Sequence, residues 1–598
     1  MRRLSFLLLA LVIGANTLFA ETVLIDGLYY SLGSTTAQVV KDQTSDNSVY
    51  SAYITVAIPA SVTYNNYTYP VTSIGTSAFE GCSNLQRVTL PSSITTIYTD
   101  AFYGCVRLER VNLEEGLTTI NLRAFYNCKL DTIVIPSTVT SIGNAAFKNN
   151  PTKAIVWKPV NCSIGSDDSA PFYSTSSQVT SFVFADGVET VPAYICKNMS
   201  LLDTIVLPPS VRSLGQAAFM YCTKLKSINL PVTQKTLPVS FFEGCTSLES
   251  IELPATLTTI STDAFYGCTK LAHVNLHEGL TTINLRAFYN CKLDSIIIPS
   301  TVTSIGNAAF KSNPTKSIVW LPKTCSIGSD DSAPFYSTTS QVTSFVFGDS
   351  VQVIPAYLCK YMNRLDSIVI PPTVTSIGQS AFMYCTKLKS FTFPQGIKTV
   401  ATSVLEGCTA LEEVFIPSSV TTINQDAFYN CSALRAIHNL AFTPQTIPER
   451  AVYNVNKQTC ILYVPMDYID LYQAANVWKD FQNIVGVATD LQFEDQLITV
   501  TYLKADADHS PHYMESQHWQ VPHAPRIEGF TFLRWEVQAG DLADGIVLQA
   551  VYESNTPTSN PSDVVVNPAN KAQKLIRNGH VYILQDDKQY TITGTKIN

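Results

Sequence analysis

Ten cysteines recur at one position of a repeated pattern, each three residues after an aromatic or leucine side chain. They are Cys82, Cys105, Cys128, Cys222, Cys245, Cys268, Cys291, Cys385, Cys408 and Cys431. Zinc would need histidines or closely paired cysteines at this position, and the pattern has neither. The uniform spacing and the odd total of 15 cysteines favour buried free thiols that pack as small hydrophobic groups. Disulfides between neighbouring repeats stay geometrically possible.

Two acidic pairs and one histidine cluster are the other candidates for metal binding. Asp167-Asp168 and Asp330-Asp331 lie in two copies of SIGSDDSAPF. Two adjacent carboxylates supply too few of the oxygen ligands that calcium takes, so a solvated turn is favoured. The clustered histidines are His509, His512, His518 and His523, and their spacing matches no standard zinc motif. We therefore predict that the protein has no metal site and no cofactor.

The motifs that assemble an enzyme active site are also missing from the sequence. It contains no Gly-x-Ser-x-Gly elbow, no phosphate-binding loop and no Gly-x-Gly-x-x-Gly fingerprint. Nothing therefore brings together a nucleophile, a base and an oxyanion site, and we predict that the protein is not an enzyme.

The elements that position these residues are sixteen sequence repeats. Each repeat is marked by one aromatic or leucine residue. These residues are Phe79, Phe102, Phe125, Phe147, Phe172, Tyr194, Phe219, Phe242, Phe265, Phe288, Phe310, Phe335, Tyr357, Phe382, Leu405 and Phe428. Their spacing is in the range of leucine-rich repeats, in which each unit adds one short strand to a parallel stack. One unit cannot cover its own apolar face, so the units are stable only when stacked.

A longer duplication lies over the short repeats. Residues 115–131 (EGLTTINLRAFYNCKLD) recur at 278–294, seven repeats further along the chain. The two copies can be compared with each other, and His273 and His277 correspond to Arg110 and Glu114 in the first copy. These histidines are therefore not a shared catalytic device.

Composition and the N-terminus indicate where the protein acts. The side chains are 46% hydrophobic and 14% charged, with a formal charge of -8 and no basic cluster. We therefore expect no nucleic-acid partner. Residues 1–20 have two arginines, an apolar run and small residues before Ala20, which is typical of a secretory signal peptide. No later apolar stretch approaches the ~20 residues that span a bilayer. We predict an exported protein, secreted or at the cell surface, without a transmembrane segment in the mature chain.

The repeat resembles the BspA-type leucine-rich repeats of bacterial surface proteins. Their pattern is a cysteine, a spaced leucine, a strand ending in Ile-Pro, a Val-Thr-Ser-Ile-Gly stretch and Ala-Phe, and VIPSTVTSIGNAAF at 134–147 matches it. The resemblance implies an α/β-type repeat solenoid with short parallel strands joined by turns or short helices. It also implies adhesion or interaction with extracellular or host-surface proteins.

The domain prediction follows from these patterns. We expect a signal peptide at 1–20, an N-terminal β flank at 21–70, the solenoid at 71–440 and a C-terminal cap at 441–487. Residues 488–553 contain GFTFLRW and resemble internalin-type β-grasp modules, so a small β domain is expected there. A linker at 554–566 and a tail at 567–598 follow. The tail is similar to the sorting signals of exported bacterial proteins, which implies association with the outer membrane.

Strand alternation identifies the side chains that should face solvent. With Ile133 and Ile135 inward, one outward column contains two blocks of aliphatic residues: Val134, Val156, Val183, Val206, and Ile297, Val319, Val346, Val369. An exposed apolar strip suits protein binding, although β-branched residues are common in strands for structural reasons alone. Tyrosines after the marker aromatic form a second candidate set: Tyr103, Tyr126, Tyr266 and Tyr289. They could bind glycans, or pack along the coil edge. A surface protein with no specific ligand is the third possibility.

Overall fold

The computed structural model describes residues 21–42, 48–165, 169–173, 176–328, 332–336 and 339–487, and separate strands within 496–597. The predicted signal peptide, both Asp-Asp pairs, His509, His523 and most of the predicted linker lie outside the described residues. The chain divides into two compact units. The first comprises residues 1–345, 353–365 and 378–386, and the second comprises 346–352, 366–377 and 387–598.

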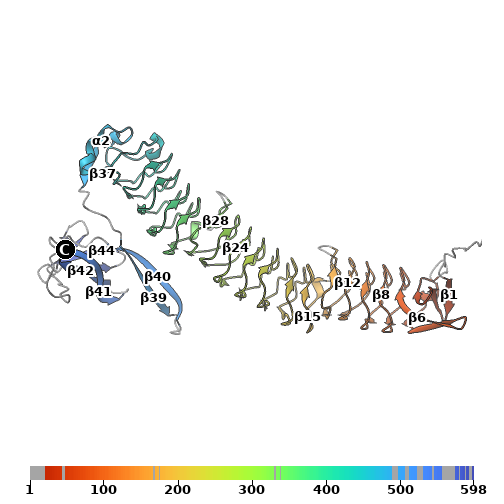
Figure 1. The fold of residues 1–598 in the computed structure, drawn as a ribbon. Helices are drawn as coiled ribbons and strands as arrows, with labels where there is room; N and C mark the ends of the chain where they lie inside the picture. Colours follow the sequence, from red (N-terminus) through yellow and green to blue (C-terminus); the bar gives the residue numbers. More distant parts are fainter. Residues whose placement is uncertain are drawn as a thin grey trace, which may run out of the picture. The chain divides into compact units, whose positions relative to one another are not determined.

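The repeats form a parallel-strand β-solenoid of about 18 turns with little helix. Each turn, or coil, contributes up to two short strands, which stack on the equivalent strands of the neighbouring coils (Figure 1). We call the side formed by the first strand of each coil the first face, and the side formed by the second strand the second face. Inward side chains of both faces fill one continuous interior in each unit.

The first face of the first unit begins next to the N-terminal flank. Its strands are β4 (Thr55–Ala57), β7 (Arg87–Thr89), β9 (Arg110–Asn112), β11 (Thr132–Ile135), β13 (Ala154–Trp157), β15 (Ser181–Phe184), β17 (Thr204–Ile205), β19 (Ser227–Ile228), β21 (Ser250–Ile251), β23 (His273–Val274), β25 (Ser295–Ile298) and β27 (Ser317–Trp320). Strand β29 (Ser344–Phe347) follows at the boundary of the two units.

The second face of the first unit is continuous with the N-terminal flank. The flank strands are β1 (Glu21–Ile25), β2 (Leu28–Leu32), β3 (Ala37–Val39), β5 (Ser61–Tyr64) and β6 (Tyr67–Ile74), with helix α1 (Ser48–Ser51) beside them. The coils then add β8 (Thr96–Ile97), β10 (Thr119–Ile120), β12 (Ser141–Ile142), β14 (Ser163–Ile164), β16 (Thr190–Val191), β18 (Ser213–Leu214), β20 (Thr236–Leu237), β22 (Thr259–Ile260), β24 (Thr282–Ile283), β26 (Ser304–Ile305), β28 (Ser326–Ile327) and β30 (Val353–Ile354). The antiparallel flank strands cover the N-terminal end of the interior, which an open coil would expose to water.

The second unit contains the last coils and the C-terminal cap. Its first-face sheet has the order β32 (Ser390–Thr392), β34 (Glu413–Ile416), β36 (Ala436–Asn439), β37 (Ile461–Pro465) and β38 (Asn483–Val487). Its second-face strands are β31 (Ser376–Ile377), β33 (Thr399–Val400) and β35 (Thr422–Ile423). Helix α2 (Ile469–Ala474) and the buried Trp478 close the end of the interior, and the Trp478 indole donates a hydrogen bond to the Gln445 carbonyl at 2.8 Å.

A column of stacked phenylalanines runs through the interior. Phe79, Phe102, Phe125 and Phe147 are fully buried, and successive ring centroids lie 5.1 to 5.3 Å apart. In these coils the aromatic residue that marks the repeat therefore contacts the same residue of the next coil.

The predicted markers Tyr194 and Tyr357 were wrong: they lie at a left-handed turn position, and the fully buried Cys196 and Cys359 take the interior place in their coils. Close packing of stacked rings favours phenylalanine at this position, although Leu405, Cys196 and Cys359 fill it in other coils.

The side of each coil between the second face and the next first face consists of tight turns. Most of these segments use two left-handed residues four positions apart, such as Asp100 (φ 58°) and Gly104 (φ 71°). Alternate amides between them bond across coils: Phe102 N–H donates to the Ala124 carbonyl at 2.8 Å. A helix cannot contain these left-handed residues, so the expected α/β character is not observed in the coils. Among the described residues, the α-helices are limited to α1 and α2.

Antiparallel strands follow the cap. They are β39 (Gln496–Ala505), β40 (Pro511–Val521), β41 (Phe530–Asp541), β42 (Gly545–Ser554), β43 (Gln573–Arg577), β44 (His580–Gln585), β45 (Lys588–Thr591) and β46 (Lys596–Ile597). Strand β39 pairs with β40, and β41 to β46 form a second sheet. The identity of residues 488–553 as a β-grasp module, and of the last residues as a sorting signal, stays a prediction. Across the described residues, no helix has the length and apolar character needed to cross a bilayer.

Candidate functional site

The first face of the first unit carries the predicted aliphatic column in register. Val134, Val156 and Val183 occupy equivalent positions on β11, β13 and β15. Ile133 and Ile135, on either side of Val134 in β11, are buried. Val134 and Val183 are 40% and 49% exposed, and Val206 in the next coil is 74% exposed. Val156 is half-buried because it lies in the middle strand of a three-stranded sheet. The predicted inward and outward positions are therefore confirmed for this block.

The second aliphatic block is less exposed than the first. Ile297 on β25 is 49% exposed and pairs in register with the half-buried Val319 on β27. Val346 and Val369, which belong to the second unit, are also half-buried. The first block, from Val134 to Val206, is therefore the stronger candidate for a binding surface, and we call it the valine strip.

The predicted tyrosines form stacked pairs on the turn side of the coils. The rings of Tyr103 and Tyr126 lie 5.0 Å apart with an interplanar angle of 11°. Tyr266 and Tyr289, their duplicates, lie 4.9 Å apart at 10°. All four side chains are half-buried, and within each pair the two facing ring surfaces cover each other.

An ion pair that the sequence analysis missed lies beside each of these tyrosine pairs. Arg123 donates to the Asp100 carboxylate at 2.7 Å, and its guanidinium lies 5.3 Å from the centroid of the Tyr103 ring. The Asp100 carboxylate raises the pKa of Arg123. The same four-residue cluster occurs at Asp263, Tyr266, Arg286 and Tyr289, and again at Asp426, Tyr429, Arg450 and Tyr453. Its recurrence in the second copy of the long duplication was the signal that could have identified it.

Buried hydrogen bonds explain the cysteine column. The Cys105 thiol donates to the Phe79 carbonyl of the preceding coil at 3.0 Å, and Cys128 repeats this with Phe102 at 3.2 Å. Fourteen of the fifteen cysteines are buried, Cys325 is half-buried, and all are free thiols in the structure. Burial raises the pKa of the Cys162 and Cys325 thiols to about 12 and raises that of the fully buried thiols further. Such thiols are poor nucleophiles and poor metal ligands.

Among the described residues, the other candidates for catalysis or metal binding are histidines and carboxylates. His277 contacts the Pro254 carbonyl through Nε2 at 2.7 Å, which links two coils. Within the described ranges, no group of three or more His, Cys, Asp or Glu side chains is arranged to hold a metal ion.

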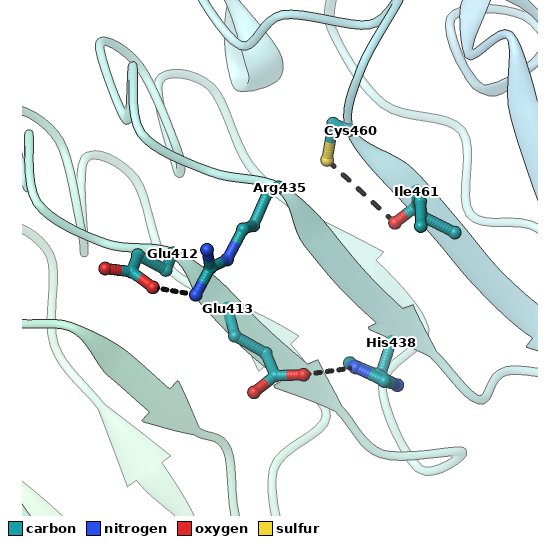
Figure 2. A network of polar contacts seen from close by, with 6 residues as sticks. All are labelled: Glu412, Glu413, Arg435, His438, Cys460 and Ile461. Carbon is teal, nitrogen blue, oxygen red and sulfur yellow. Dashed lines mark hydrogen bonds and ion pairs between the residues drawn. The ribbon is translucent and has the colours of Figure 1, made fainter. Parts of the chain in front are cut away.

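A second outward surface lies on the first face of the second unit. Phe415, His438 and Tyr463 are in register on β34, β36 and β37, and their rings stack at centroid distances of 4.2 and 4.5 Å. Figure 2 shows Glu413, which accepts a hydrogen bond from His438 Nε2 at 2.8 Å, and the Glu412–Arg435 ion pair next to it. The outward position of Phe415 and His438 agrees with strand alternation, but sequence analysis did not identify the aromatic stack.

Comparison with known proteins agrees with this architecture. The model of the BspA type leucine rich repeat region matches residues 60–154, 163–263, 189–317, 235–363 and 352–473, which together exceed half of the chain. No curated protein is significantly similar to the chain. Proteins with these repeats are generally non-enzymatic and bind other proteins.

Solved leucine-rich-repeat structures are also similar. A leucine-rich repeat protein from Bacteroides ovatus is 25% identical, with a TM-score of 0.45, over 74% of this chain and 99% of the other. A leucine rich cell surface protein from Faecalibacterium prausnitzii is 25% identical, with a TM-score of 0.25, over 73% and 92%. A leucine-rich repeat protein from Eubacterium ventriosum is 19% identical, with a TM-score of 0.26, over 68% and 93%. On the extent of the repeat match, the chain belongs to the BspA-type leucine-rich-repeat family.

Proposed function

We propose that this protein is exported to the cell surface, where it binds other proteins through the first face of its solenoid. The observation that supports this proposal is the valine strip, in which four aliphatic side chains of successive coils lie on the outward side of the face. An exposed apolar strip on a rigid scaffold is the kind of surface that protein partners bury.

The intrinsic preference of strands for valine accounts for only part of the strip, because Val206 lies beyond the end of β17 and is 74% exposed. Other coils place Asn112, Asn229, Glu252 and Asn275 at the same outward position. The coil therefore still forms with a polar residue there, although β19, β21 and β23 end one residue before this position, whereas β11, β13 and β15 include it. Burying the valine strip in a complex would contribute about 25 cal/mol for each Å² of apolar surface removed from water.

The mechanism would be many weak contacts made at once by a preformed surface. Each coil is fixed to its neighbours by backbone hydrogen bonds, so little conformational entropy would be lost on binding. Attachment to extracellular or host-surface proteins, and association with the outer membrane, belong to this proposal. They follow from the surface-protein character of the family and from the predicted signal peptide.

Glycan binding by the tyrosines is the alternative function. A sugar ring stacks on an aromatic face, and each tyrosine pair leaves only its two outer faces for such a contact. A surface protein without a specific ligand is the remaining alternative.

One experiment separates the three functions. The mature chain is screened against an array of extracellular-matrix proteins and glycans, and the best hit is then titrated with variants. We expect V134T/V156T/V183T/V206T, which keeps β-branched residues, to weaken binding to a protein hit at least tenfold. The matched control, S181A/T204A/S227A, changes the neighbouring outward column and should retain affinity. Unfolding midpoints should be similar for the wild type and both variants.

Results that differ from this expectation would support one of the two alternative functions. Loss of binding in Y103A/Y126A/Y266A/Y289A, together with competition by free sugar, would support glycan recognition. An array without a specific hit would support the structural alternative and contradict the proposal.

A further inference from the structure

Two arginines lie side by side on the first face, immediately before the valine strip. Arg87 on β7 and Arg110 on β9 are paired in register on adjacent parallel strands, and both side chains are exposed. Adjacent strands lie about 4.8 Å apart, so the two guanidinium stems start from nearly the same place. Like charges directly opposite each other destabilise a sheet. This pair is therefore a local cost unless something anionic binds it.

The residues around Arg87 and Arg110 do not bind their guanidinium groups. Among the described residues, neither arginine side chain forms a hydrogen bond or ion pair. The neighbouring Glu109 is bound by Lys129 Nζ at 2.7 Å, and its pKa is lowered mainly by Lys129 and to a smaller extent by Arg110. Glu115 accepts a hydrogen bond from Ser137 Oγ at 2.8 Å. The first face therefore presents two cations without a direct anionic partner, in a chain whose formal net charge is -8.

The internal duplication shows that the fold does not require these charges. In the second copy the equivalent strands β21 and β23 pair in the same way, and Ser250 and His273 occupy the positions of Arg87 and Arg110. A serine and a histidine therefore fit the same place in the same coil. The arginine pair is a feature of the first copy only, where it precedes the valine strip.

The arginine pair and the valine strip lie on the same face, in consecutive coils. In the outward column next to the arginines, Thr89 pairs with Asn112, and Val134, Val156 and Val183 pair with one another in the coils that follow. Val206 takes the equivalent position in the next coil. From the coil of Arg87 to that of Val206 is five coils, or about 24 Å at a strand spacing of ~4.8 Å. An extended peptide covers that distance with about seven residues at ~3.4 Å each.

We infer that this surface binds an extended segment of a protein partner that has acidic residues at one end and apolar residues at the other. The carboxylates bind Arg87 and Arg110, because guanidinium groups pair with carboxylates through charge-assisted hydrogen bonds. The apolar side chains lie on the valine strip. This inference rests on the proposed function and specifies the chemical class of the partner.

Surface-immobilised octaglutamate tests the acidic end by itself. Binding of the full mature chain is measured at pH 7.5 and about 20 mM salt, where exposed charges are weakly screened. We expect R87S/R110H, which copies the second repeat block, to lower octaglutamate affinity at least fivefold. The matched control K226S/K316S removes two exposed positive charges beside other strands of the first face and should change affinity less than twofold. Equal losses in the two variants, or no binding by the wild type, would overturn the inference.

Two further arms separate the possible outcomes. A sulfated oligosaccharide that binds in an arginine-dependent manner, where octaglutamate does not, would overturn the protein segment as the partner. The valine-strip variant V134T/V156T/V183T/V206T should bind octaglutamate like the wild type, because this probe has no apolar side chains. If that variant also captured protein partners normally, the proposed function would fail while arginine-dependent binding of the acidic probe remained.

Discussion

The Sγ atom of Cys105 lies 3.0 Å from the carbonyl oxygen of Phe79, and the two residues belong to consecutive coils. The thiol thus supplies a hydrogen bond between coils while its sulfur packs in the interior. Because this geometry recurs along the column, it determines how the cysteines respond to chemical reagents.

Native thiols should resist alkylation. We expect iodoacetamide at pH 8 to modify at most Cys325 over an hour, because the other thiols are buried and burial raises their pKa. In guanidinium chloride without reductant, all fifteen cysteines should react, as counted by mass spectrometry. Rapid native labelling of Cys105, or thiols that stay unreactive in denaturant, would contradict the free and buried arrangement.

Asn150 replaces cysteine in one coil of the first copy and makes more hydrogen bonds than the thiol does. Its carbonyl oxygen accepts from Leu130 N–H at 3.0 Å, and its amide donates to the carbonyls of Phe125 and Phe147 at 2.8 Å. We expect Asn150→Asp to lower the free energy of unfolding by about 2–3 kcal/mol, because a buried carboxylate cannot donate to these carbonyls. Denaturant titration measures the loss. Asn149→Asp, at the adjacent less buried position, is the control and should cost less than half as much.

Two glycines should differ in how they tolerate a methyl group. Gly104 has a positive φ but open space around a Cβ, so Gly104→Ala should cost about 1 kcal/mol through backbone strain alone. A Cβ on Gly143 would overlap the backbone of Asn121 and Leu122 in the preceding coil. Gly143→Ala should therefore cost at least about 2 kcal/mol. Thermal or denaturant unfolding of the two variants provides the comparison, and equal losses would show that coil spacing adjusts freely.

The Asp100–Arg123 ion pair should contribute modestly to stability. The Arg123 side chain is 44% exposed and that of Asp100 is 14% exposed, so solvent screens part of the attraction. A double-mutant cycle with Asp100→Asn and Arg123→Gln should give a coupling of about 0.5–1 kcal/mol. Asparagine is chosen because Asp100 has a left-handed backbone, a conformation that asparagine also adopts readily. A coupling near zero would mean that the tyrosine stack alone fixes this cluster.

Sequence periodicity predicts whether a repeated residue faces inward or outward. It does not predict contacts between residues of different coils. Strand alternation placed Ile133 inside and Val134 outside, because the side-chain period of a strand is fixed. It could not show that Val156 is half-buried, which depends on the strands on both sides. Nor could it pair Asp100 with Arg123, since their contact joins two coils and needs a turn geometry that composition does not encode.

The α/β expectation failed for a related reason. A resemblance to leucine-rich repeats implies turns or short helices between strands. The choice between them depends on left-handed residues such as Asp100 and Arg123, whose conformation is visible only in the structure. In these coils the turns make hydrogen bonds to the neighbouring coil that a helix would have satisfied within itself.

The backbone hydrogen bonds between coils bear on how the repeat array could have evolved. Equivalent coils of the two copies present the same donors and acceptors to their neighbours, as in the Phe125 N–H bond to Ala146 and the Phe288 N–H bond to Ala309, so a block that begins and ends at equivalent positions can be inserted or deleted without a mismatch at the joint. The long duplication that relates residues 115–131 to 278–294 is one such block. Recombination between repeats can therefore add or remove whole coils, and one copy of a duplicated block can change its outward side chains while the other copy stays unchanged.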